Sequence, residues 1–153
     1  MADCVGCPAA LDAEQRVDRL DRGQLGGGRV VITLDEAPRP LTDTERAVIE
    51  RLLSVSFPGR DELLAQLPHV TVEGRCGCGC VTVNLAVERA AAPAPVLSSA
   101  PVSADLSDGE DYAGIVLLVD GDRYLSCLEV YSMGNEPVRQ LPPAERINPV
   151  PRQ

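Results

Sequence analysis

The sequence contains no lysine, because all 14 of its basic residues are arginine. A lysine is needed for a Schiff base with a carbonyl substrate, for a P-loop and for the ATP site of a kinase, so these chemistries are excluded. Tryptophan is also absent, and aromatic residues make up only 3% of the chain. Few aromatic rings for base stacking and a formal charge of −9 disfavour binding to nucleic acid. The same charge favours a basic protein as the partner, because an acidic surface speeds its encounter with positive charge.

Long apolar stretches are missing as well. No run of about 18 apolar residues occurs, so we expect no membrane-spanning helix and no membrane partner. The first residues, MADCVGCPAALDAEQ, lack the basic start and apolar core of a signal peptide, and we therefore expect a cytoplasmic protein. In that compartment the six cysteines are expected as reduced thiols or metal ligands.

Familiar catalytic patterns are not found in the sequence. It has no Gly-x-Ser-x-Gly, no His-Glu-x-x-His and no dinucleotide-binding glycine pattern. A Cys–His catalytic pair would have to use His69, the single histidine, which precedes an expected strand. The acidic segment DLSDGED at 105–111 lacks the Asp-x-Asp-x-Asp-Gly spacing of a calcium loop. We favour a protein without catalytic activity and keep an enzyme of unknown chemistry as the less favoured interpretation.

Two helices are expected near 43–55 and 60–66. Thr42 and Glu45 have the spacing of a capping box at the start of the first helix. Apolar residues then recur at the i, i+3 and i+4 positions that build one helix face.

Four main strands are expected at about 69–75, 80–88, 114–120 and 123–131, with RVVITL at 29–34 as a fifth candidate. In the first pair, the apolar positions change from even to odd numbers, which indicates an antiparallel hairpin. The sequence therefore predicts an α+β fold: a small antiparallel sheet of about four to five strands with two helices packed on one face. The expected core residues are Val48, Leu52, Leu64, Val72, Val83, Leu85, Val116, Leu118, Leu128 and Val130.

The domain organisation follows from composition. We expect a flexible or weakly ordered N-terminal arm at 1–28, which ends in a glycine-rich break. A single α+β domain is expected at 29–145, with a loop rich in Ala, Pro and Ser at about 89–112. Residues 146–153 are expected as an irregular tail.

The segment RCGCGC at 75–80 is the most unusual part of the sequence. If Val72 pairs with Val83, then Gly77 and Cys78 form a two-residue turn, in which glycine suits the first position of type II′. In this register the Cys76 side chain, before the turn, faces the core, and the Cys80 side chain, after the turn, faces the outer side of the sheet. We therefore interpret the segment as a turn in which the thiols diverge.

A zinc site is the alternative interpretation, and no other cofactor is expected. Zinc takes about four ligands in a tetrahedron, and the glycines would let neighbouring thiolates converge. The N-terminal pair has the Cys-x-x-Cys spacing of a zinc knuckle or a redox dithiol, although no strand precedes it as in thioredoxin-like proteins. The candidate ligands are Cys76, Cys78, Cys80 and His69, with Cys4 and Cys7 as a second source.

The chain resembles a group of small uncharacterised bacterial proteins over about residues 41–143. The shared features are an opening LT..E helix, an RC.CGC segment and a closing LEV strand followed by an LP tail. The resemblance implies no established activity and no catalytic residue. Size, acidity and the lack of catalytic motifs are also similar to immunity proteins, which neutralise toxins by binding.

Two hypotheses of function follow. The first is a non-catalytic, acidic protein-binding module, immunity-like in character, which neutralises or regulates a basic protein partner. The second is a small zinc-binding protein that uses the RCGCGC segment. The sequence does not predict an oligomeric state.

Overall fold

The computed structural model describes residues 32–33, 38–76, 79–107, 112–134 and 136–152. Its elements are, in chain order, β1 (Ile32–Thr33), β2 (Arg39–Pro40), α2 (Asp43–Leu52), α3 (Arg60–Gln66), η2 (Leu67–His69), β3 (Val70–Cys76), β4 (Val83–Val87), β5 (Val102–Asp105), β6 (Ala113–Val119), β7 (Leu125–Ser132), η3 (Ala144–Arg146) and β8 (Pro149–Pro151). Both predicted helices and all four main predicted strands are present, with ends that differ by a few residues. The predicted arm at 1–28 lies outside the described residues.

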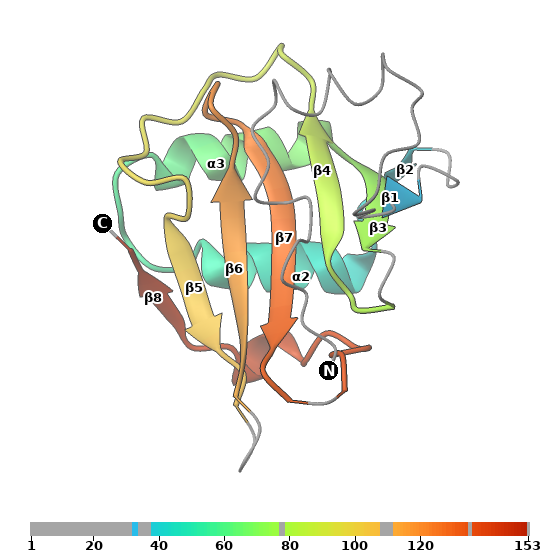
Figure 1. Cartoon of the computed structure of the whole chain (residues 1–153). Coiled ribbons are helices and arrows are strands. Elements are labelled where there is room, and N and C mark those ends of the chain that lie inside the picture. Colours follow the sequence, from blue (N-terminus) through green and yellow to red (C-terminus); the bar gives the residue numbers. More distant parts are fainter. Residues whose placement is uncertain (1–31, 34–37, 77–78, 108–111, 135, 153) are drawn as a thin grey trace.

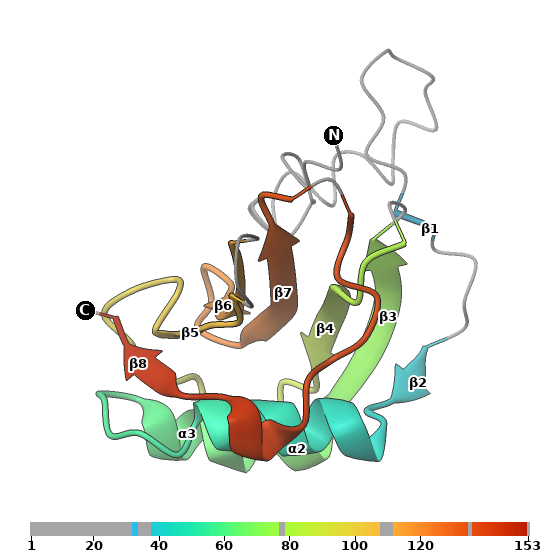
Figure 2. The same cartoon turned by 90° about the horizontal axis from the view of Figure 1, so that it is seen from below.

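One antiparallel sheet runs through the fold (Figure 1). Its strand order is β1-β3-β4-β7-β6-β5-β8, and β2 pairs with β3 beside β1. Figure 2 shows α2 and α3 together on one face of the curved sheet. The predicted α+β class is therefore confirmed, but the described residues form eight strands and not four to five. The unpredicted strands β2, β5 and β8 have only two to four residues each, too few to display an alternating pattern.

Helix α2 begins at a capping box, as predicted. The Thr42 hydroxyl accepts a hydrogen bond from the Glu45 amide at 3.2 Å, and the Glu45 carboxylate accepts one from the Thr42 amide at 2.9 Å. Arg39 donates to both oxygens of the same carboxylate, at 2.9 and 3.0 Å. These contacts anchor the start of α2 to the strand before it. The buried residues Val48 and Leu52 follow on its inner face.

The main core lies between the helices and the sheet. Val48, Leu52, Val72, Val83, Leu85, Leu128 and Val130 are buried in it as predicted, and Leu64 is partly buried against it.

Strand β6 is present as predicted, but the prediction that Val116 and Leu118 belong to the core is wrong. Ile115, Leu117 and Val119 pack in the core, so Val116 and Leu118 lie on the opposite face of the sheet. The strand is apolar at every position from 115 to 119, and alternation could not distinguish its two faces.

Strands β3 and β4 form the predicted hairpin in a different register. Val72 lies opposite Leu85 and not Val83, whereas Arg75 lies opposite Val83. Between these pairs the register shifts by one residue, which identifies a β-bulge at Glu73. After a bulge, each following side chain points to the face opposite to the one that simple alternation predicts.

Residues 136–148, which we term the C-terminal strap, run from the end of β7 to β8 around one end of the core (Figure 2). The Val81 amide donates to the Val138 carbonyl at 3.0 Å, and Arg51 Nε of α2 donates to the Ile147 carbonyl at 2.9 Å. Ile147 is fully buried, so the strap closes this end of the core.

Strand β8 pairs with β5 at the edge of the sheet. The two strands lie inside the segments predicted as a loop at 89–112 and an irregular tail at 146–153. Proline occurs at both ends of β8, and a proline-rich composition is typical of an edge strand as well as of an irregular tail. No helix in the described part of the chain is long and apolar enough to cross a membrane.

Candidate functional site

Cys76 lies at the end of β3, beyond the bulge at Glu73. Its side chain packs against Cys127 of β7, together with Leu118 of β6. These residues lie on the face of the sheet that the helices do not cover. The prediction that Cys76 faces the core is therefore wrong, because the bulge inverts the alternation of β3.

Cys80 is buried and lies near Glu129 of β7. Glu129 is two residues beyond Cys127 and therefore on the same face of the sheet as Cys127. Burial raises the pKa of the Glu129 carboxyl, and the nearby Cys80 thiol raises it further. The predicted divergence of Cys76 and Cys80 to opposite faces is therefore not found.

Two polar residues of the β4 region complete this buried face. Asn84 lies opposite Cys127 and is 6% exposed, and its Oδ1 has no hydrogen-bond partner among the residues that the structure describes. The Thr82 hydroxyl donates to the Val130 carbonyl at 3.1 Å and accepts from the Val130 amide at 2.9 Å. Thr82 thus joins β4 to β7 with a side chain where the backbone pairing ends.

The predicted metal ligands are not all brought together. His69 lies at the opposite end of β3 from Cys76, a separation of roughly 20 Å at the rise of a strand, and its Nδ1 is 3.7 Å from a Glu88 carboxylate oxygen. Within the described ranges, no three His, Cys, Asp or Glu side chains are close enough to hold a metal ion. Cys4, Cys7 and Cys78 lie outside the described residues.

Two backbone hydrogen bonds span the segment that contains the predicted turn, and one of them runs from the Cys76 amide to the Thr82 carbonyl at 3.2 Å. The Gly79 amide donates to the Cys76 carbonyl at 3.4 Å. Gly79 has a φ of 86°, a left-handed conformation that favours glycine. The predicted type II′ turn itself falls on Gly77 and Cys78, which are not among the described residues.

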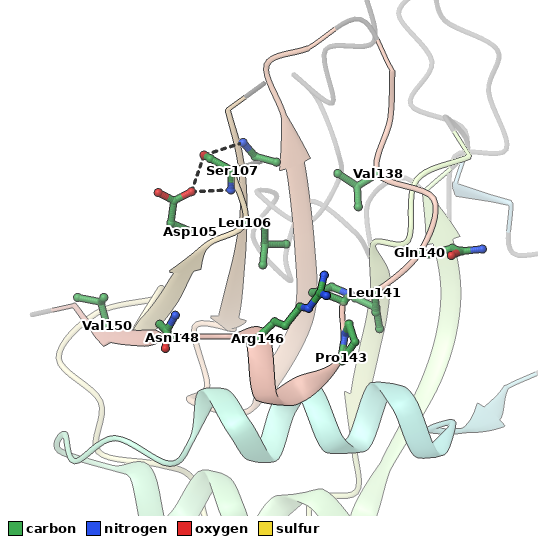
Figure 3. Close-up of a pocket in the computed structure, with 12 residues that line it drawn as sticks. Asp105, Leu106, Ser107, Val138, Gln140, Leu141, Pro143, Arg146, Asn148 and Val150 are labelled. Carbon is green, nitrogen blue, oxygen red and sulfur yellow. Dashed lines mark hydrogen bonds between the residues drawn. The ribbon is translucent and has the colours of Figure 1, made fainter. Parts of the chain in front are cut away.

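A groove of about 800 Å³ lies between the end of β5 and the C-terminal strap (Figure 3). This volume is within the range of ligand sites. Polar side chains such as Asp105 and Gln140 line it together with apolar ones such as Leu106. The lining residues include Asp105, Leu106, Ser107, Ala113, Val138, Gln140, Leu141, Pro143, Arg146 and Asn148.

Asp105 and Arg146 are the charged side chains of this groove. The Asp105 carboxylate accepts hydrogen bonds from the Ser107 hydroxyl at 2.5 Å and the Ser107 amide at 2.8 Å, which lower the pKa of Asp105. Figure 3 shows the Arg146 side chain rising from η3 into the middle of the groove, beneath Leu106. Asp105 lies at one side of the groove, so a negative charge at that side faces a positive charge in the middle.

Two tyrosines and a methionine lie next to the groove, where β6 begins and β7 ends. Tyr112 is 50% exposed and Met133 is 74% exposed, and the Met133 amide donates to the Tyr112 carbonyl at 2.8 Å. The ring of Tyr131 lies 6.1 Å from that of Tyr112, centroid to centroid. Burial raises the pKa of Tyr131, and the neighbouring Tyr112 raises it further. We term Tyr112, Tyr131 and Met133 the rim.

The negative charge is unevenly distributed along the chain. Of the 23 acidic residues and 14 arginines, 13 and 10 are among the described residues, which gives these a formal charge of −3. The remaining −6 belongs to residues outside the description. Three of those acids, Asp108, Glu110 and Asp111, connect Ser107 to Tyr112 in sequence.

Neither the groove nor the rim was predicted from the sequence. Arg146 belongs to the tail that composition indicated as irregular, and exposure at the end of a hairpin has no periodic signal. The sequence did contain one signal for the rim. It has only three tyrosines, and two of them, Tyr112 and Tyr131, meet there. Comparison of the chain with protein-family models, curated proteins and solved structures finds no match.

Proposed function

We propose that the protein is a non-catalytic protein-binding module, and that the rim is the surface by which it binds a basic protein partner. The observation that carries this proposal is the exposure of Tyr112 and Met133 at adjacent positions, joined by a backbone hydrogen bond. Tyrosine and methionine are enriched in protein interfaces, and tyrosine is enriched among the residues that dominate binding energy. Single exposed apolar residues are ordinary, but here Tyr112 and Met133 lie together, and the ring of Tyr112 lies beside that of Tyr131.

Charge supports a basic partner. Asp105 lies close to the rim, because it pairs with Gly114 of β6, which pairs in turn with Tyr131 of β7. The positive charge of Arg152 also acts on Tyr131. The four residues between Ser107 and Tyr112 add three carboxylates in sequence. A formal charge of −9 on the whole chain would accelerate encounter with a positive protein. The module would neutralise or regulate that partner by occupying its surface.

Affinity capture from a lysate of the native host tests the proposal. The full chain is immobilised as wild type, as Tyr112→Ala with Met133→Ala, and as the control Leu97→Ala. Leu97 is 77% exposed and lies on the loop after β4. It is therefore an exposed apolar residue like those of the rim, but it lies outside the rim. We expect a basic protein to be retained by wild type and control, released by moderate salt, and lost from the double variant. Equal capture by all three forms would contradict the proposal.

A zinc-binding protein is the second candidate function. The specific observation in its favour is that the bulge at Glu73 brings Cys76 to the same sheet face as Cys80. Zinc would use these two thiolates and that of Cys78. Elemental analysis and a thiol titration of the purified protein test this candidate. About one zinc per chain, lost in Cys80→Ser but kept in Cys127→Ser, would support it, and a metal-free protein would exclude it.

A further inference from the structure

The groove contains a positive charge that no described residue neutralises. The Arg146 guanidinium has no ion pair and no hydrogen bond within the described part of the chain. The second charged group, Asp105, is already held by Ser107 through two hydrogen bonds and lies across the groove from Arg146 (Figure 3). Arg146 is therefore available for an anion from outside the chain.

The surroundings of Arg146 limit what that anion is attached to. Leu106, Val138 and Leu141 line the same groove, and each is partly buried against the main core. Guanidinium groups bind carboxylates with two parallel hydrogen bonds. A cation next to an apolar wall matches a ligand that carries a carboxylate and an apolar side chain on neighbouring atoms.

We propose that the groove receives the C-terminal residue of the partner protein, with its carboxylate on Arg146 and an apolar side chain against Leu106 and Leu141. The last residue of a protein chain bears both groups on one Cα. Ser107 holds only Oδ1 of Asp105, so Oδ2 of that carboxylate would take a basic side chain a few residues earlier in the partner. The inference rests on the proposed function, since the same basic partner supplies the terminus.

The size of the groove agrees with this occupant, because about 800 Å³ is room for a few residues of extended chain. Arg146 and Asn148, which line the groove, are exposed, so it can be reached from solvent. A phosphate group fits this groove poorly. Only one guanidinium, that of Arg146, would bind it, and its other oxygens would face apolar side chains and the Asp105 carboxylate.

Fluorescence anisotropy with synthetic peptides tests the inference. The probe is a dye-labelled hexapeptide that ends in Arg-Gly-Gly-Leu with a free carboxylate, and its match is the same peptide with a C-terminal amide. We expect the amide to bind about tenfold more weakly, the order of one charge-assisted hydrogen-bonded contact. In Arg146→Gln the acid and the amide should bind alike. Arg139→Gln serves as control, because Arg139 lies on the same strap but directs its guanidinium towards Gly79.

Three other results would contradict the inference that the groove binds a C-terminal carboxylate. Equal binding of acid and amide by the wild-type protein, or no binding of either, removes the carboxylate from recognition. A third peptide, amidated at its terminus but with an internal glutamate, would identify an acidic side chain as the occupant if it bound as well as the acid. Arg146 is exposed, so its substitution should leave the melting temperature unchanged. If host-lysate capture by the rim persists while the peptides fail, the groove inference falls and the proposed function stands.

Discussion

The ring of Tyr131 lies directly against Gly114 on the neighbouring strand. The two residues are paired across β6 and β7, and a Cβ atom added to Gly114 would collide with the Tyr131 ring and hydroxyl. Glycine at 114 is thus a steric requirement of the rim, because it lets Tyr131 lie flat across β6 and support Tyr112.

Gly114→Ala should therefore disturb the rim. The Tyr131 ring must move away from β6, and we expect a lower melting temperature together with weaker capture of the partner. Gly121→Ala is the matched control, since nothing lies within 4 Å of the added Cβ there. Thermal unfolding and partner capture are measured for both variants. If Gly114→Ala is as stable and captures as much partner as Gly121→Ala, the Tyr131 ring does not pack against Gly114.

Glu45→Gln should make the protein less stable at neutral pH. Burial raises the pKa of Glu45, but hydrogen bonds from Arg39 and Thr42 and the Arg39 charge outweigh it, so the pKa is lowered from 4.5. A carboxyl group with a lowered folded-state pKa stabilises the fold fully above its unfolded pKa, and this contribution is lost as pH falls through the folded value. We expect a loss of about 1–3 kcal/mol at pH 7, as for a charge-assisted hydrogen bond, which shrinks below about pH 4.5.

Urea unfolding of wild type and Glu45→Gln across this pH range is the measurement. Glu50→Gln on the exposed side of α2 is the control and should show little pH-dependent difference. A deficit for Glu45→Gln that stays constant down to pH 3 would contradict the ionic contribution.

Glu129→Gln should have the opposite effect. The pKa of Glu129 is raised by burial and by Cys80, so the group favours the folded state below its unfolded pKa of about 4.5 and this contribution is lost as pH rises through the folded value. The amide avoids the cost of a buried negative charge, and we expect a higher melting temperature at pH 7 and no gain near pH 4. Glu136→Gln, at an exposed carboxylate, provides the reference. A melting temperature of Glu129→Gln below wild type at pH 7 would contradict the burial of Glu129 beside Cys80.

Leu52→Ala should cost about 2–5 kcal/mol of unfolding free energy, through lost burial and a residual cavity. Leu52 is fully buried between α2 and the sheet. Leu97→Ala, at a side chain that is 77% exposed, should change stability by less than about 0.5 kcal/mol. Chemical denaturation measures both, and a similar small effect in the two variants would mean that α2 does not pack as described.

Local signals account for the parts of the fold that the sequence predicted. The Thr42–Glu45 capping box lies within a few residues of chain, and so does the parity change between β3 and β4. The failures involve contacts whose determinants are distant in sequence. Strand β6 is apolar on both faces, so only its pairing with β7 decides that Leu117, and not Leu118, enters the core.

The candidate site was harder to predict than the fold. A single bulge at Glu73 reverses Cys76, and no residue type marks that position in the sequence. The groove forms because the strap carries Arg146 back to β5, about 40 residues away in sequence. Composition indicated an irregular tail there, whereas the strap is held by hydrogen bonds to β4 and α2.

The most direct test of the central claim is photo-crosslinking from the rim. A photoreactive phenylalanine analogue is placed at position 112, where Tyr112 is half exposed, and in a second protein at position 97. After irradiation in a lysate of the native host, the crosslinked proteins are identified by mass spectrometry. We predict that position 112 captures one basic protein and that position 97 does not. Crosslinks from position 112 that match those from position 97, or that lead to acidic proteins, would contradict a binding function at the rim.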